Sequence, residues 1–341
     1  MKKLLIISLV IFLISTTFIA CNKNTNNSPV NVSSVASENS VIPENCAHTY
    51  TESFDLKPRA LDSGIKRFTC SICNHSYTES VPATKTLKVL AFGNSFSIDA
   101  MEYLYGICKD AGVENIVLGN LHIGGCSIST HVKNIEENID DYTYYKNTTG
   151  SWMRNNLFTA KDAIEQEDWD IITIQQKSAA SGQKSSYTQL ESLIDYIKST
   201  KPNATIMWHM TWAYAKNCSL TAFENYNKDQ MTMYNSIINV IEEKIIPNSN
   251  INYIIPSGTA IQNLRTSYLG DTLNRDGYHL SHGIGRYTAA LTWYSVLTGG
   301  SVDNITYVPD KYPEIKDHLN VIKESVNNAL NSSYSVTQSK Y

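Results

Sequence analysis

From residue 87 onward, short apolar runs alternate with longer segments of helical periodicity. Strands are predicted at 87–92, 115–118, 170–174, 204–208 and 252–255, and helices near 99–111, 155–167, 187–199, 221–245 and 283–298. Strands that alternate with helices usually pair in parallel, because each helix returns the chain to the same edge of the sheet. The sequence therefore predicts an α/β fold with a central parallel sheet between two layers of helices.

The first predicted strand ends in Gly93-Asn94-Ser95, so a serine lies at the carboxyl end of that strand. Sheets of this class hold their active sites at that edge. Far downstream, Asp276 and His279 are three residues apart. A hydroxyl, an imidazole and a carboxylate are the groups that acyl transfer through a serine ester requires. We therefore predict Ser95 as nucleophile, His279 as general base and Asp276 as the acid that orients it. His282 is the rival base, and a helix cap is the alternative role for Ser95.

Three segments resemble sequence blocks of the SGNH/GDSL hydrolases, a family of esterases and lipases. Residues 93–97 resemble the first block, 120–125 the second and 276–279 the last. The resemblance implies a three-layer α/β/α sandwich of the SGNH-hydrolase or flavodoxin-like type over residues 87–330. It also implies that the backbone N–H of Gly125 contributes to the oxyanion hole, whereas from the residues alone Gly124-Gly125 could simply permit a tight turn.

The third block departs from the family pattern. After the strand that ends at 174, the family usually has Gly-x-Asn-Asp, whose asparagine completes the oxyanion hole, but this chain has Gln175-Gln176-Lys177-Ser178. A glutamine amide can donate the same hydrogen bond. Gln176 is therefore the predicted substitute, and Gln175 is the second choice. Both glutamines could instead be satisfied polar groups at a strand end. The resemblance is nearer to divergent carbohydrate esterases and to bacterial surface proteins that share Gly-Asn-Ser-Phe-Ser.

The pattern of the amino terminus predicts a secretion signal. Two lysines precede an apolar run that ends at Ala20, and Cys21 follows. Residues 18–21 resemble the lipobox of bacterial lipoproteins, which implies removal of residues 1–20 and a lipid on Cys21; an ordinary signal peptide is the alternative. The polar residues 21–44 then form a spacer. This predicts a protein anchored to a membrane at the bacterial cell surface or periplasmic face.

Residues 45–84 contain a cluster of potential metal ligands. Cys46, His48, Cys70 and Cys73 have a spacing that can close a tetrahedral zinc site. The segment also resembles zinc-ribbon-like repeats of bacterial surface proteins, with Asn74 where the knuckle usually has glycine. A disulfide is the competing interpretation outside the cytoplasm. Any zinc here is expected to be structural, and the catalytic group needs no cofactor. Three further cysteines, at 108, 126 and 218, are expected to be buried thiols.

Composition limits the partners of the chain. The formal net charge is -4 and no long basic run occurs, which argues against nucleic acid. Trp152, Trp208, Trp212 and several tyrosines are expected in or beside loops, where aromatic faces stack on sugar rings. The predicted substrate is an acylated carbohydrate or another small ester, and the predicted reaction is removal of O-acetyl groups. A glycan-binding protein without activity and a sugar O-acyltransferase are the alternatives. The sequence gives no indication of the oligomeric state.

Overall fold

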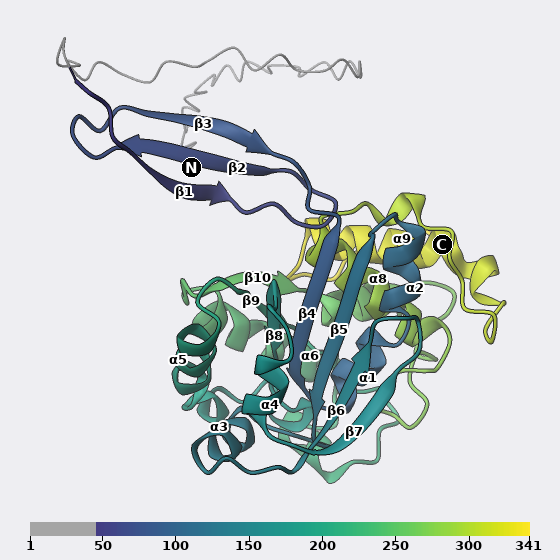
Figure 1. Ribbon diagram of the computed structural model, residues 1–341. Coiled ribbons are helices and arrows are strands. Elements are labelled where there is room, and N and C mark those ends of the chain that lie inside the picture. The colour runs from purple at the N-terminus through teal and green to yellow at the C-terminus, as the bar shows by residue number, and fades with distance from the viewer. Residues whose placement is uncertain (1–45) are drawn as a thin grey trace, which may run out of the picture. The chain divides into compact units, whose positions relative to one another are not determined.

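A seven-stranded sheet forms the centre of the computed structural model, which describes residues 46–341 (Figure 1). The strand order is β10-β9-β8-β4-β5-β6-β7. The strands are β4 (Thr86–Gly93), β5 (Asn115–His122), β6 (Tyr142–Asn147), β7 (Met153–Phe158), β8 (Ile171–Ile174), β9 (Thr205–His209) and β10 (Ile251–Ile255). The predicted signal peptide, Cys21 and the spacer 21–44 lie outside the described residues.

Helices cover both faces of this sheet. They are α1 (Ser95–Met101), α2 (Leu104–Asp110), α3 (Ile128–Glu136), α4 (Ala160–Glu165), α5 (Leu190–Thr200), α6 (Gln230–Val240), α7 (Ser257–Leu264), α8 (Ile284–Thr298) and α9 (Ile315–Asn331). Helices α1, α2, α8 and α9 gather on one side, and α3, α4 and α5 gather on the other (Figure 1). The predicted three-layer α/β/α fold is confirmed. Within residues 46–341, no helix combines the length and apolar character that a membrane span requires.

The central strand β4 explains why this sheet needs helices on both sides. Residues 89–93 are all buried, so neighbouring side chains that point to opposite faces are equally shielded from water. Such continuous apolar runs are typical of parallel strands enclosed by two helical layers. The last residue of this strand, Gly93, leads directly into the turn that carries Ser95.

The helix predicted at 155–167 is partly wrong, because residues 155–158 belong to strand β7. Strands β6 and β7 form an antiparallel hairpin that extends one edge of the otherwise parallel sheet. Thr159 and Asp162 explain the boundary, since they form a capping box that starts α4 at Ala160. The residues before this cap are therefore left free to continue as a strand.

Two other predicted helices are each divided. The segment 99–111 becomes α1 and α2. The segment 221–245 becomes a 3-10 turn (Thr221–Tyr226), α6 and a π turn (Ile241–Ile245). Asn227 and Lys228 both have positive φ, at 56° and 53°, which interrupts the helical backbone. Asp229 then accepts a hydrogen bond from the Thr232 N–H and starts α6 as its N-cap.

Residues of the predicted Cys/His module form a separate three-stranded antiparallel sheet. Its strands are β1 (Tyr50–Leu56), β2 (Gly64–Cys70) and β3 (Ser76–Val81), in the order β1-β2-β3. Most of its side chains are exposed or half-buried. Phe68 and Tyr77 stack across β2 and β3 with ring centroids 4.8 Å apart. So small an apolar contact leaves this sheet in need of a further crosslink.

Candidate active site

The residues predicted to act in catalysis follow the carboxyl ends of neighbouring parallel strands. Ser95 follows β4, Gly124 and Gly125 follow β5, and Gln175 and Gln176 follow β8. The chain passes from β4 to β5 on one side and later returns to β8 on the other side of β4. Such a change of direction opens a crevice at the carboxyl edge of a parallel sheet. Ser95 lies beside this switch point.

Each residue of the segment 93–97 has a role in the turn that presents Ser95. A Cβ atom at Gly93 would lie 2.0 Å from the Oγ of Ser97, so only glycine fits there. Asn94 is the N-cap of α1, and its Oδ1 accepts a hydrogen bond from the Phe96 N–H at 3.0 Å. Ser97 Oγ donates to the Asn94 carbonyl at 2.7 Å. Ser95 is thereby held as the first helical residue, with its side chain half-buried at the edge.

Asp276 and His279 lie on a tight loop whose backbone is held by the aspartate itself. Asp276 Oδ1 accepts hydrogen bonds from the N–H groups of Tyr278, at 3.2 Å, and His279, at 2.7 Å. Gly277 adopts a φ of +88°, and a Cβ atom there would lie 2.8 Å from the Cα of Cys218. The loop closes where Arg275 N–H donates to the His279 carbonyl at 3.0 Å. The Asp-x-x-His spacing therefore produces one fixed turn.

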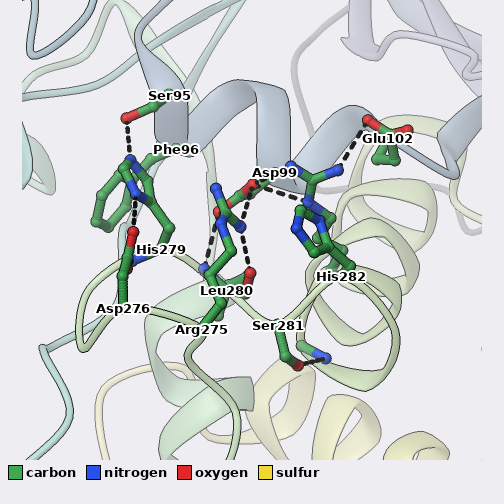
Figure 2. A network of polar contacts seen from close by, with 12 residues as sticks. Ser95, Phe96, Asp99, Glu102, Arg275, Asp276, His279, Leu280, Ser281 and His282 are labelled. Carbon is green, nitrogen blue, oxygen red and sulfur yellow. Dashed lines mark hydrogen bonds and ion pairs between the residues drawn. The ribbon is translucent and has the colours of Figure 1, made fainter.

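The three side chains form a continuous hydrogen-bonded relay (Figure 2). His279 Nδ1 lies 2.7 Å from Asp276 Oδ2, and His279 Nε2 lies 2.8 Å from Ser95 Oγ. Burial alone would raise the pKa of Asp276, but hydrogen bonds from the side chain and backbone of His279 outweigh it and lower the pKa below its ordinary value. The ionised carboxylate can only accept, so Nδ1 carries the proton and Nε2 accepts from the Ser95 hydroxyl. His282, the rival base, is outside this relay.

Aromatic rings support the imidazole from two sides. Tyr278 lies against His279 with ring centroids 4.0 Å apart, and Phe96 lies 5.9 Å away. Phe96 itself stacks on Trp212 at 4.3 Å, and the indole N–H of Trp212 donates to the Tyr278 carbonyl at 2.7 Å. Trp212 is fully buried and Trp208 is 2% exposed. Our expectation of these two tryptophans in sugar-binding loops is therefore wrong, since both belong to the core.

Gly125 lies on an exposed turn whose position is tied to the serine turn. Its φ of +63° is in the left-handed region, and no heavy atom of another part of the described chain lies within 4 Å of an added Cβ. The next residue, Cys126, accepts a hydrogen bond at its carbonyl from Asn94 Nδ2 at 3.0 Å. Asn94, the residue before the serine, is therefore hydrogen-bonded to the residue after the glycine. The N–H of Gly125 stays the predicted oxyanion donor.

The two glutamines have other partners in the structure. Gln176 Nε2 donates to the Ser186 carbonyl at 2.9 Å and to Ser186 Oγ at 3.1 Å, which accounts for both of its N–H groups. Gln175 is 2% exposed, and its Nε2 donates to Asn94 Oδ1 at 2.8 Å. In this arrangement Gln176 reaches an oxyanion only if it releases Ser186. The oxyanion role of both glutamines stays a prediction, and neither contact supports it.

A buried histidine that the sequence did not single out supports Gln175. His209, at the end of β9, lies 2.7 Å from Gln175 Oε1 through its Nδ1. Because Gln175 uses its amide N–H toward Asn94, its oxygen must accept, and His209 carries its proton on Nδ1. Burial lowers the pKa of His209 to about 3, so the ring is neutral at physiological pH. The chain His209–Gln175–Asn94 thus holds the cap of the serine turn. Its only sequence signal is polar residues that directly follow buried strands.

The ligand atoms of Cys46, His48, Cys70 and Cys73 lie within 4.8 Å of one another. A tetrahedral zinc with Zn–S of about 2.3 Å and Zn–N of about 2.0 Å places its ligands about 3.5 to 3.8 Å apart, so a small contraction completes the site. Burial would raise the pKa of the Cys70 thiol, but hydrogen bonds from the Cys73 backbone and the His48 side chain lower it to about 5, which favours the thiolate that metals bind. Asn74 adopts the predicted left-handed conformation, with φ of 61°. The cluster is able to bind a metal.

The other cysteines are buried as expected. Cys108 is fully buried, Cys126 is 1% exposed and Cys218 is 7% exposed. Burial raises the pKa of all three thiols, which keeps them protonated.

Comparison with known proteins places this site within a family. The model of a domain of unknown function, DUF4886, matches residues 88–329. The chain belongs to the DUF4886 family. A crystal structure of a DUF4886 family protein from Bacteroides uniformis ATCC 8492 is 43% identical, with a TM-score of 0.70, and the match covers 74% of this chain and 98% of that chain. The DUF4886 segment thus contains all three residues of the relay.

More distant structures also match this DUF4886 protein. A putative SGNH hydrolase from Slackia heliotrinireducens is 17% identical with a TM-score of 0.41, covering 63% of this chain and 100% of that chain. An acetyl xylan esterase is 14% identical with a TM-score of 0.40, covering 62% of this chain and 100% of that one. A search of curated proteins gave no match.

Proposed function

We propose that this DUF4886 protein is a serine esterase in which Ser95, His279 and Asp276 carry out acyl transfer. The observation that carries the proposal is the relay from Ser95 Oγ through His279 to the Asp276 carboxylate, with distances of 2.8 Å and 2.7 Å. Both distances are within the range for proton transfer by a general base. The relay also lies at the carboxyl edge of the parallel sheet, beside the switch point.

The chemistry follows from the protonation state of the relay. Ser95 Oγ attacks the ester carbonyl while its proton passes to His279 Nε2, and Asp276 stabilises the imidazolium that forms. The backbone N–H groups of Ser95 and Gly125 are the proposed donors to the tetrahedral oxyanion. His279 then protonates the leaving alcohol as its bond to the carbonyl carbon breaks. Water attacks the acyl-serine in a second round, with His279 again accepting the proton, and the free acid leaves.

We propose a short acyl group on a sugar as the substrate. Gly124 and Gly125 are exposed, with no other heavy atom of the described chain within 4 Å of an added Cβ, and Ser95 is half-buried, which is compatible with a bulky alcohol. The ring of Tyr278 lies directly against His279, where the leaving alcohol must pass, and it is half-buried. An amphipathic ring at that position offers a face to a sugar ring.

Release of acetate from acetylated xylan or an acetylated sialic acid tests this proposal. The Ser95→Ala variant should abolish release, and a Cys46→Ala variant should retain it, because the Cys/His cluster has no part in the chemistry. Transfer of the acetyl group to an added sugar acceptor in place of water would identify an acyltransferase. If no short acyl ester is turned over under any condition, the esterase proposal is wrong.

A glycan-binding protein without catalysis is the second candidate. One observation favours it, because both N–H groups of Gln176 are used by Ser186 and the third oxyanion donor of the resembled family is not replaced in this arrangement. This candidate would be supported if the protein bound a glycan tightly but hydrolysed no ester, and if the Ser95→Ala variant bound the same glycan with unchanged affinity.

We further propose that Cys46, His48, Cys70 and Cys73 hold a structural zinc ion. The proximity of the four ligand atoms and the lowered pKa of Cys70 support this. A site with four protein ligands leaves no open position for a substrate. Zinc would crosslink the small sheet β1-β2-β3, which has little apolar core of its own.

Anchoring through a lipid on Cys21 is a separate proposal that rests on the sequence alone, because that residue lies outside the described part of the chain. Membrane fractionation of the full chain and of a Cys21→Ser variant, followed by mass spectrometry of the mature amino terminus, tests it. A lipid-free amino terminus at another residue would contradict it.

A further inference from the structure

We propose that Asp99 is a positioning residue for the catalytic loop and acts through Arg275. This inference rests on the proposed esterase function and deepens it, since it concerns how His279 and Asp276 are held in position relative to Ser95. Asp99 lies on α1, four residues after Ser95, and its side chain is fully buried. A carboxylate so deep in the protein is found only where it is paired and hydrogen-bonded.

The Asp99 carboxylate binds the backbone next to His279 in two ways (Figure 2). Its Oδ2 accepts a hydrogen bond from the N–H of Leu280 at 2.8 Å. Its two oxygens also lie 3.0 and 3.1 Å from Nη1 of Arg275, and this same nitrogen donates to the carbonyl oxygen of Leu280. Both backbone polar groups of Leu280 are thus fixed, directly or through Arg275, by one side chain of α1.

This arrangement fixes the position of the His279 imidazole relative to Ser95 through a short stretch of α1. Ser95 and Asp99 are separated by about one helical turn, or roughly 6 Å along the axis of α1. Arg275 and Leu280 flank the Asp276–His279 segment on both sides. The helix that carries the nucleophile therefore also carries the anchor of the base and of its orienting acid. A displacement of about 1 Å at such a site lowers the rate by about 100-fold.

Arg286 is a control residue for this proposal, because it pairs with the charge of Asp99 without binding the catalytic loop. It binds the same carboxylate, with Nε and Nη2 each 2.8 Å from Asp99 Oδ1, and its Nη1 lies 3.2 Å from Glu102. Its side chain is more buried than that of Arg275, with 12% against 28% exposed. Arg286 lies on α8, and among the described residues its guanidinium forms hydrogen bonds or ion pairs with Asp99 and Glu102 but not with the loop 275–280. Arg275 and Arg286 thus share the charge partner, whereas only Arg275 contacts the loop backbone.

The test compares Arg275→Met with Arg286→Met, two variants that each leave Asp99 with one guanidinium. For each we measure kcat and KM on a short acyl ester, thermal unfolding, and the His279 Nδ1–H resonance in protein labelled with 15N-histidine and assigned with His279→Gln. Arg275→Met should lower kcat about 100-fold, leave KM within about threefold, and broaden or shift that resonance. Arg286→Met should keep kcat within about threefold and keep the resonance, even if it unfolds at a lower temperature. Arg275→Lys should recover part of kcat.

Equal losses of kcat in both methionine variants, in proportion to their loss of stability, would overturn the inference. So would an unchanged His279 resonance in Arg275→Met. Failure of the esterase proposal would give a different result. The wild-type protein would then turn over no ester, but the His279 resonance would still change in Arg275→Met and stay unchanged in Arg286→Met. Asp99→Asn serves as a second probe of the resonance, and its folding is checked first.

Discussion

Replacing Asp276 by asparagine should reverse the tautomer of His279 and so remove the general base. In the structure Asp276 Oδ1 accepts two backbone N–H groups, and Oδ2 faces His279 Nδ1 at 2.7 Å. Asparagine has one oxygen, which is best used against the two N–H groups. Its amide N–H then faces Nδ1, so the imidazole proton moves to Nε2, which no longer accepts from Ser95.

The size of this effect follows from the cost of turning the amide over. The productive tautomer would need the amide nitrogen to face the two backbone N–H groups, at a cost of about 2 kcal/mol for each unsatisfied donor. The total of about 4 kcal/mol corresponds to a decrease of about 1000-fold in kcat/KM. The Asx turn is kept, so the melting temperature should change little.

The assay is hydrolysis of 4-nitrophenyl acetate by Asp276→Asn and wild type, with the tautomer of His279 read from its 15N shifts. We expect the proton on Nδ1 in the wild type and on Nε2 in the variant. A variant that keeps kcat/KM within about tenfold of wild type, or whose imidazole still carries the proton on Nδ1, would refute the reasoning.

Three further predictions concern pH, metal and backbone. Burial lowers the pKa of His131 and His209 from 6.5 to about 3, so the unfolded state takes up their protons first. Stability is full well above pH 6.5 and has fallen by about 4 kcal/mol at pH 5, and His131→Phe should halve that fall in urea titrations. Cys73→Ser, or a strong chelator, should remove one bound zinc per chain by elemental analysis while ester hydrolysis persists; no zinc in the wild-type protein would contradict the site. Gly277→Ala should destabilise the protein by about 2 kcal/mol and lower kcat, because the added Cβ meets Cys218 in a left-handed backbone; an unchanged melting temperature would count against this.

Strand and helix alternation was enough to predict the layers but not the sheet edge. The buried strands β4, β8 and β9 have apolar runs that only a covered sheet explains. By contrast, β6 and β7 have polar, half-exposed sequences, and their pairing depends on the hairpin between them. The sequence of β7 runs almost directly into that of α4, so one helix is predicted across most of both. The capping box at Thr159 and Asp162 was the available signal for that boundary.

The relay residues could be predicted because each belongs to a short local motif, a serine after a strand and an Asp-x-x-His turn. The residues that hold the relay in place could not, since their partners are distant in sequence. Asp99 binds Arg275 across 176 positions, and Gln175 binds Asn94 across 81. The oxyanion role that the sequence predicts for Gln175 stays a prediction, and the structure adds a hydrogen bond from its amide to Asn94 in the serine turn. Only the fold shows such long-range pairs.

Labelling with a fluorophosphonate probe tests the central claim most directly, because only a serine activated by a neighbouring base forms the covalent adduct at a useful rate. Wild-type protein should be labelled at Ser95, as located by peptide mass spectrometry, and His279→Gln should not. A wild-type protein that stays unlabelled, or that is labelled equally well without His279, would contradict the account.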